Sequence, residues 1–238
     1  MQVFRRLRPI AAISFDLDDT LYDNRPVIAA AEQAYLDCLQ REFPLTRQWG
    51  KHEWRHHKLG VMVKYPRLSH DPTALRLETL KSGLRHFGLS HEDANAGAEQ
   101  VMAEFVHARS NFRVPDSTLQ LLSKLKRRYP LIGLTNGNVD PTRIGLQGVL
   151  DFVLSAGDGN RMKPHPDLFA IGCDRLGILP SALLHVGDSH SADVQGALRA
   201  GCQAVLLNPG FGQTVSLPLL SPLPHLQISR LHELEMLL

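Results

Sequence analysis

The chain has 238 residues, of which 43% are hydrophobic and 21% are charged, and its formal net charge is +2. This composition is ordinary for a globular protein with a sizeable core, and the charge is too small to indicate a nucleic acid as partner. Its three cysteines are too widely spaced for a disulfide framework or a metal site. No apolar run approaches a membrane span and no signal peptide is apparent, so we expect a cytoplasmic protein that does not bind a membrane.

The first predicted element is a buried strand from Ile10 to Phe15, which ends in three closely spaced carboxylates, Asp16, Asp18 and Asp19. Carboxylates repel one another at close range, so folding alone does not explain the cluster, whereas a bound cation or a reaction would. The cluster also lies at the carboxyl end of the strand, where open α/β sheets bind their ligands. We therefore interpret Asp16 and Asp18 as site residues and assign Asp19 to the shape of the loop.

Residues 24–113 contain helical patterns and no convincing strand, which predicts a helical insertion after the first strand. Asn24 followed by Pro26 is a typical helix start, and Ser90 with Asp93 resembles a capping box. One predicted helix begins at Asn24, and the others cover residues 46–59, 71–88 and 90–109.

The remainder of the chain alternates between helical and strand patterns. Strands are predicted at residues 131–135, 152–155, 183–186 and 204–207, and helices at 116–125, 166–176 and 191–200. Such alternation implies a parallel sheet covered by helices on both faces. The predicted fold class is α/β, with a doubly wound, Rossmann-like parallel-sheet core formed by residues 1–23 and 114–238 and a second, helical domain at 24–113. The Pro- and Leu-rich stretch 217–226 is interpreted as a tail or linker.

Further polar residues follow the later predicted strands. They are Thr135, Asn136, Lys163, Asp188 and Asp193. Because the carboxyl ends of parallel strands meet at one edge of the sheet, we expect these side chains to lie near Asp16 and Asp18. Together they offer a nucleophilic carboxylate, a proton carrier, a hydroxyl and a lysine for an anion, and acidic groups for a hard cation. This inventory indicates phosphoryl transfer through a covalent aspartyl-phosphate.

The chemistry of that reaction assigns a role to each group. Repulsion between Asp16 and a phosphate dianion would be relieved by Mg²⁺ held by Asp16, Asp188 and a main-chain carbonyl. Lys163 would neutralise charge in the transition state, and Thr135 with the amides after it would donate to phosphoryl oxygens. Asp18 would protonate the leaving alkoxide and then deprotonate the attacking water. The residues predicted to bind the phosphate are Thr135, Asn136 and Lys163.

Four short segments resemble the ordered motifs of the haloacid dehalogenase (HAD) superfamily, and together they span residues 10–207. These segments are Asp16–Thr20, Thr135–Gly137, Lys163–Pro164, and Gly187–Ser189 with Asp193. The insertion at 24–113 resembles the helical C1-type cap domain of that superfamily, whose closure would exclude water and select the substrate. The resemblance implies a Mg²⁺-dependent hydrolase, specifically a phosphatase of a small-molecule phosphate ester.

The same resemblance implies roles for individual acidic residues. Asp16 would be the nucleophile and Asp18 the general acid and base. The metal ligands would be Asp16, Asp18 and Asp188. Asp193 would be a supporting residue that either orients Lys163 or stabilises the surroundings of the metal.

Two segments, Phe15–Pro26 and Pro222–Leu231, resemble a narrower bacterial group, the YigB-type phosphatases. That resemblance implies FMN or 5-amino-6-(5-phosphoribitylamino)uracil, an intermediate of riboflavin biosynthesis, as the substrate. The alternatives are another small ester, such as a sugar phosphate or phosphoglycolate, a haloacid dehalogenase and a phosphomutase. Asp18 argues against a dehalogenase, because that reaction attacks carbon and needs neither this acid nor Mg²⁺. An inert binding protein is disfavoured because every key group is present.

One pattern indicates a different chemistry. His52–His56 reads H-E-x-x-H on a predicted helix, as in zinc peptidases, and Glu78 is a conceivable third ligand. The longer metzincin pattern fails, so we favour a polar helix of the cap. Trp54, His57 and Tyr65 are candidates for contact with the substrate, since a planar ring would pack against an aromatic wall.

Overall fold

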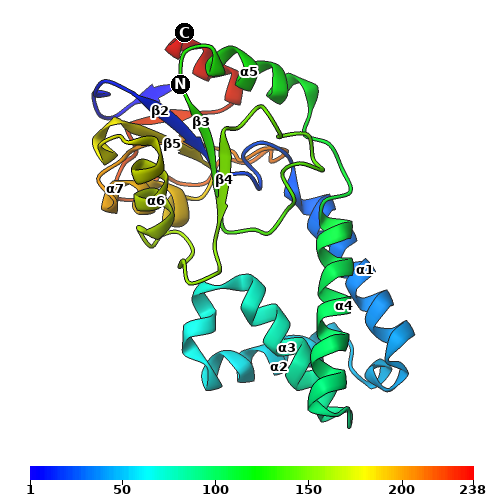
Figure 1. Ribbon diagram of the computed structural model, residues 1–238. Coiled ribbons are helices and arrows are strands. Elements are labelled where there is room, and N and C mark those ends of the chain that lie inside the picture. The colour runs from blue at the N-terminus through cyan, green and yellow to red at the C-terminus, as the bar shows by residue number, and fades with distance from the viewer.

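The computed structural model describes residues 1–238 and shows an α/β core joined to a separate helical body (Figure 1). The core contains a seven-stranded sheet with strand order β1-β7-β6-β5-β2-β3-β4. Neighbouring strands are parallel except for β1 and β7. The strands are β1 (Gln2–Val3), β2 (Ala12–Phe15), β3 (Leu131–Thr135), β4 (Phe152–Ser155), β5 (Leu183–Gly187), β6 (Gln203–Leu207) and β7 (Leu226–Ile228).

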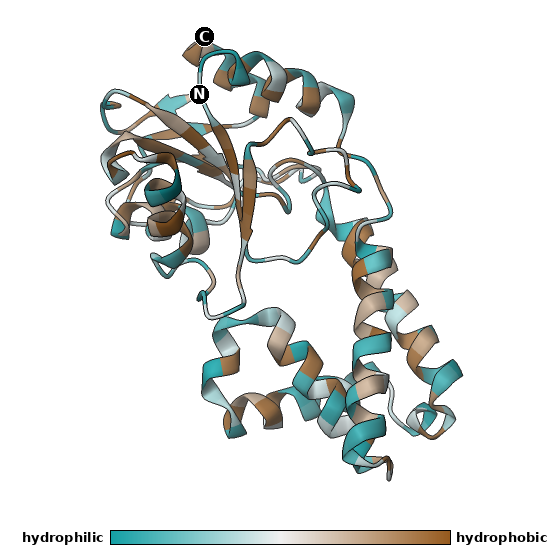
Figure 2. Cartoon of the chain, in the orientation of Figure 1, coloured by the Kyte–Doolittle hydropathy of each residue, from teal (hydrophilic) through white to brown (hydrophobic).

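Helices cover both faces of this sheet (Figure 1). On one face, α5 (Asp116–Lys126) and the C-terminal 3₁₀ helix (Leu231–Leu237) contribute to a cluster of 23 buried hydrophobic residues. On the other face, α6 (Asp167–Leu176) and α7 (Gly196–Arg199) contribute to a cluster of 12. Apolar residues line the strands between the two layers (Figure 2). The predicted doubly wound α/β class is confirmed.

The C-terminal edge of the sheet differs from the prediction. The stretch 217–226 leads into β7, which pairs with β6 so that Leu226 lies opposite Val205. β1 then pairs with β7 in the antiparallel direction. Both strands are too short to produce a periodic pattern, so β6 was wrongly predicted to be the last strand.

The segment predicted as a helix at 191–200 is divided in two. A π-helical turn at His190–Gln195 precedes α7. This wide turn lays Asp193 against the end of β5, where a Cβ on Gly187 would meet the Asp193 carboxyl carbon at 2.2 Å. Only glycine leaves room at position 187 for the buried carboxylate of Asp193.

The helical body, called the cap below, comprises residues 24–109. Its helices are α1 (Asn24–Glu42), α2 (Lys51–Lys64), α3 (Pro72–His86) and α4 (His91–Arg109), with 3₁₀ helices at Pro44–Gln48 and Pro66–His70. α1 and α4 lie side by side and connect the cap to the core (Figure 1). The cap has its own cluster of 12 buried hydrophobic residues. As predicted, it contains no strand, but the helix predicted at 46–59 breaks at Gly50, where Glu53 caps α2.

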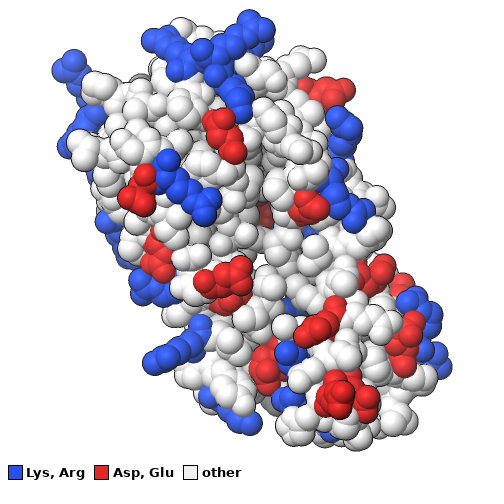
Figure 3. Space-filling model, in the orientation of Figure 1, with Lys and Arg blue, Asp and Glu red and all other residues white.

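The core and the cap meet through polar contacts on the side opposite to the chain termini (Figure 1). The Met162 N–H donates to the carbonyl of His70 at 3.0 Å, and Asn138 Nδ2 donates to Thr73 Oγ1 at 3.2 Å. Lys and Arg side chains gather at the other end of the core, near both termini (Figure 3). None of the helices is both long and apolar enough to cross a membrane.

Candidate active site

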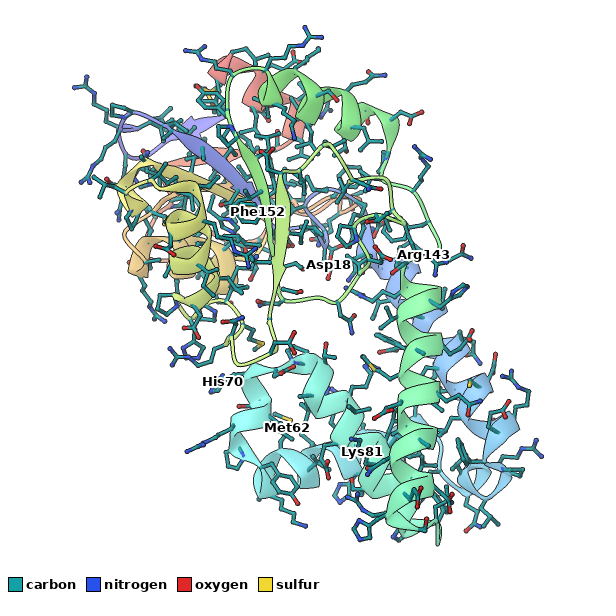
Figure 4. All side chains as sticks on the ribbon, viewed as in Figure 1. Asp18, Met62, His70, Lys81, Arg143 and Phe152 are labelled. Atoms are coloured by element: carbon teal, nitrogen blue, oxygen red, sulfur yellow. The ribbon has the colours of Figure 1, made fainter.

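Three adjacent parallel strands bring the predicted residues to one edge of the sheet. β2 lies between β3 and β5, with Phe15 opposite both Gly133 and Val186. The residues that end or follow these strands therefore meet at this edge: Asp16, Thr135 and Asp188. The edge faces the cap, and Asp18 lies at this junction (Figure 4).

Lys163 is the centre of the site. Its Nζ donates to Asp16 Oδ1 at 2.7 Å, to Asp193 Oδ1 at 2.7 Å and to the carbonyl of Leu134. Only 1% of Lys163 is exposed. Burial disfavours the ammonium, but the two carboxylates outweigh it and raise the pKa of Lys163 above its ordinary value. Burial also disfavours the charged form of Asp16 and therefore raises the pKa of its carboxyl group, while the nearby Lys163 ammonium counteracts this rise.

Asp193 anchors this lysine. Besides Lys163, it accepts from the Ser189 N–H at 2.9 Å and contacts His185 Nε2 at 3.1 Å. Burial opposes ionisation of Asp193, yet Lys163 and His185 hold the pKa of Asp193 well below its ordinary value. On its other side, His185 Nδ1 lies 2.9 Å from Ser14 Oγ. His185 was not predicted as a site residue. Through Asp193 and Ser14 it links the support of Lys163 to strands β5 and β2. A single histidine in a buried strand gives no indication of such a role in the sequence.

The second oxygen of Asp16 faces Asp188. Thr20 Oγ1 lies 3.5 Å from Asp16 Oδ2 and 3.4 Å from Asp188 Oδ1. The ligand atoms of Asp16, Asp188 and Asp193 all lie within 4.8 Å of one another. The positive charge of Lys163 neutralises the negative charge of Asp193, whereas no basic side chain forms an ion pair with Asp188. Burial raises the pKa of Asp188 to about 7. The uncompensated oxygens of Asp16 and Asp188 are donors that fit a hard cation such as Mg²⁺.

The carboxylate of Asp18 points away from this group. Its Oδ1 accepts from the Tyr22 hydroxyl at 2.5 Å, and its Oδ2 accepts from Arg109 Nη2 at 2.5 Å. Arg109 is the last residue of α4, is 3% exposed, and also donates to Asn24 Oδ1 at 3.2 Å. Asp18 can therefore offer a metal its main-chain carbonyl rather than its side chain. Neither Tyr22 nor Arg109 was predicted, and the only sequence signal is the spacing of four between Asp18 and Tyr22.

Thr135 and Asn136 contribute in different ways. The buried Thr135 hydroxyl accepts from the Gly137 N–H at 2.9 Å, which leaves its own proton available for a phosphoryl oxygen. The Asn136 side chain instead holds the main chain of Lys163. Its Nδ2 donates to the Lys163 carbonyl at 2.9 Å, and its Oδ1 accepts from the Lys163 N–H at 2.7 Å. Asn136 therefore positions Lys163.

A cavity of about 240 Å³, called the site cavity below, opens beside Asp18 between the core and the cap. Its walls include Asn24, Thr73, Arg76, Phe105, Arg109 and Asn138. None of the three predicted substrate contacts lines it. Trp54 is buried in the cap cluster, His57 Nε2 contacts Ser82 Oγ at 2.7 Å, and Tyr65 is 39% exposed at the end of α2.

The H-E-x-x-H segment has a structural explanation. Glu53 Oε2 accepts from the Gly50 N–H at 2.7 Å and so caps α2, while the His52 side chain is 89% exposed. Glu78 pairs with Arg85 at 3.0 Å. The group of three side chains arranged for a shared metal ion lies in the core and includes none of these residues.

Comparison with known sequences connects this geometry to a family. The haloacid dehalogenase-like hydrolase profile matches residues 10–201. The chain is 38% identical over 238 residues, covering 100% of both proteins, to the 5-amino-6-(5-phospho-D-ribitylamino)uracil phosphatase YigB of Escherichia coli (strain K12). It is 28% identical over 245 residues, covering 98% of this chain and 95% of the relative, to the N-acylneuraminate-9-phosphatase of Rattus norvegicus.

Solved structures show the same architecture. The crystal structure of the 2-haloacid dehalogenase from Pseudomonas syringae pv. Tomato DC3000 superposes with a TM-score of 0.87 and 31% identity, covering 95% of this chain and 97% of that one. The HAD-hydrolase YfnB from Bacillus subtilis, solved bound to magnesium, has a TM-score of 0.65 and 20% identity, covering 97% and 99%. The second likeness shows the fold alone.

Proposed function

We propose that this chain, which belongs to the haloacid dehalogenase-like hydrolase family as its motifs predicted, hydrolyses a small phosphate ester through an aspartyl-phosphate on Asp16. The two relatives compared by sequence over almost their full length are phosphatases, and it is an enzyme of that kind. One observation carries the proposed mechanism. Lys163 donates to Asp16 Oδ1 at 2.7 Å and so holds the Asp16 carboxylate in place, and Asp18 lies two residues away with its carboxylate lining the site cavity.

In the first step, the Asp16 carboxylate attacks phosphorus, and the bond from phosphorus to the ester oxygen breaks. Asp18 gives its proton to the leaving alkoxide, which departs as an alcohol. The Thr135 hydroxyl donates to a phosphoryl oxygen, and the positive charge of the anchored Lys163 ammonium stabilises the negative charge that spreads over the phosphoryl group. The buried anchors of Lys163 keep its ammonium in place, so little reorganisation is needed in the transition state.

In the second step, the ionised Asp18 takes a proton from water as the water oxygen attacks phosphorus. The bond from phosphorus to Asp16 breaks, inorganic phosphate leaves, and Asp18 has regained its proton. Arg109 and Tyr22 both donate to Asp18 at 2.5 Å, so they orient its carboxylate for both proton transfers.

Asp16 and Asp188, with the main-chain carbonyl of Asp18, would hold Mg²⁺, which would reduce the repulsion between the nucleophile and the phosphate. The support is the uncompensated carboxylate of Asp188 beside Asp16 Oδ2. Asp193 is fully engaged with Lys163, His185 and Ser189, and we assign it to the positioning of Lys163.

The substrate we propose is FMN or 5-amino-6-(5-phosphoribitylamino)uracil, hydrolysed in the cytoplasm. The support is the relative YigB, at 38% identity over the whole of both chains. The site cavity of about 240 Å³ lies where the leaving alcohol would extend past Asp18 toward the cap. The alternative is another small ester, such as a sugar phosphate or phosphoglycolate, which the same catalytic residues would serve.

The test is a steady-state comparison of phosphate esters that includes FMN, the ribitylaminouracil phosphate, sugar phosphates and phosphoglycolate, with Mg²⁺ present. We expect kcat/KM to be higher for the two ribityl phosphates by about tenfold or more. Asp16→Asn should abolish turnover, while the matched control Asp37→Asn, on the surface of α1, should not. An Asp16→Asn enzyme that still hydrolyses p-nitrophenyl phosphate refutes the mechanism, and haloacid turnover in EDTA would establish a dehalogenase.

A further inference from the structure

Arg76 on α3 stands between two cavities. It lines the site cavity together with Asp18 and Arg109. It also lines a cavity of about 460 Å³ within the cap, which is bordered by α1, α2 and α3 and includes Glu32 and Lys58 in its walls. Arg76 is the one residue common to both, so a group that enters past Asp18 reaches its guanidinium before the interior of the cap.

Aromatic side chains hold this guanidinium in place. Arg76 Cζ lies 3.9 Å from the centre of the Phe105 ring and 5.6 Å from that of Tyr35. Both aromatic residues belong to the buried cluster of the cap, so the platform beneath Arg76 is rigid. An arginine stacked in this way loses little freedom when its planar edge forms hydrogen bonds.

The donors of Arg76 have no partner in the protein. Arg109, which faces the same cavity, pairs with Asp18 and Asn24, whereas no carboxylate or carbonyl oxygen accepts from Arg76. Glu32, the acidic residue that lines the cap cavity, forms neither a hydrogen bond nor a salt bridge with Arg76, although its charge favours the charged guanidinium. No nitrogen of Arg76 is completely buried, so its donors are accessible from the cavities and available to a bound acceptor.

We propose that Arg76 recognises carbonyl or carboxylate oxygens on the leaving group of the phosphate ester, with Phe105 fixing the plane of its guanidinium. The inference rests on the proposed function and narrows its substrate class: the leaving alcohol carries oxygen acceptors at the end remote from the phosphate. Three further basic residues line the cap cavity against a single acid, so the field there also favours electron-rich groups; they are Lys51, Arg55 and Lys58.

The first experiment measures binding without catalysis. Riboflavin carries ring carbonyls and lacks the phosphate, so its Kd, read from flavin fluorescence, reports contacts to the leaving group alone. Arg76→Met should raise this Kd by about 10- to 100-fold, the range expected for a charge-assisted hydrogen-bonded pair, and Arg76→Lys should raise it less. Arg47→Met is the matched control, because Arg47 is exposed in the cap and lines neither cavity. Equal Kd values for wild type and Arg76→Met exclude ring carbonyls as the acceptor, and together with an unchanged ratio for the carboxylate pair below they overturn the inference.

The second experiment compares kcat/KM ratios. FMN against ribitol 5-phosphate tests ring carbonyls, and phosphoglycolate against ethyl phosphate tests a carboxylate. Arg76→Met should lower the first or the second ratio by about tenfold or more, which identifies the acceptor, while Arg47→Met leaves both ratios unchanged. If both ratios are unchanged, or every ester loses activity equally, Arg76 does not select the leaving group. Should Arg76→Met fail to fold, Arg76→Lys gives the same two ratios. A wild-type enzyme inactive on all esters would refute the proposed function, while the riboflavin Kd would still test Arg76.

Discussion

The carboxylate of Asp188 should destabilise the metal-free protein at neutral pH, and Asp188→Asn should remove this cost. Burial, followed by repulsion from Asp193 and Asp19, raises the pKa of Asp188 from 3.8 to about 7. No basic side chain forms an ion pair with Asp188, whose carboxylate contacts the Thr20 hydroxyl at 3.4 Å, and the opposing effect of the Lys163 charge is smaller than that of burial. Asparagine keeps the shape of the side chain and carries no charge.

The magnitude and the pH window follow from the shift in pKa. A rise from 3.8 to about 7 corresponds to about 4 kcal/mol, and partial exposure of Asp188 to water reduces this to about 2 kcal/mol. The folded-state pKa of Asp188 exceeds the unfolded one. Below pH 3.8 the carboxyl is protonated and its favourable contribution to stability is fully present; this contribution is lost as the pH rises through about 7, and the ionised carboxylate then destabilises the fold. Asp188→Asn should therefore gain most at pH 8, with a Tm higher by about 4–8 °C, and clearly less at pH 5.

The assay is thermal unfolding of EDTA-treated wild type, Asp188→Asn and the surface control Asp37→Asn at pH 5 and pH 8. Added Mg²⁺ should raise the Tm of the wild type and not that of Asp188→Asn, which should also lack phosphatase activity. If Asp188→Asn is no more stable than the wild type at pH 8, or if its advantage is the same at both pH values, the reasoning is refuted.

Two other substitutions should act through different physical causes. Asp193→Asn leaves the buried Lys163 with one of its two carboxylate partners. The free energy of unfolding, measured by urea denaturation, should therefore fall by about 3 kcal/mol. An unchanged denaturation midpoint would contradict this expectation. Arg109→Met removes a donor from Asp18, so kcat should fall by about 10- to 100-fold with little change in KM, and Arg109→Lys should recover part of the loss; an effect on KM alone would assign Arg109 to substrate binding.

The sequence by itself determined most secondary elements and the edge of the sheet at which the site lies. Strand β3 has the predicted bounds, and Ser90 caps α4 by accepting from the Asp93 N–H at 3.1 Å. Such signals are local, because they depend on periodicity and on residues within one helical turn. Asp16 and Asp188 were placed correctly at strand ends because parallel strands present their carboxyl ends together. Strand β7 was missed because its three residues gain their order from pairing with β6.

The tertiary structure alone decided what each acidic group faces. Asp18 is held by Arg109, 91 positions away, and Lys163 reaches Asp16 across 147 positions. No spacing in the sequence indicates these pairs, because they depend on how α4 returns to the core and how the Lys163 loop folds over the sheet. The orientation of the Arg76 side chain has the same origin, because its guanidinium stacks on the Phe105 ring only when α3 packs beside α4. Local sequence therefore indicated which groups gather at this edge of the sheet, while long-range packing determined their partners and the cavity beside Asp18.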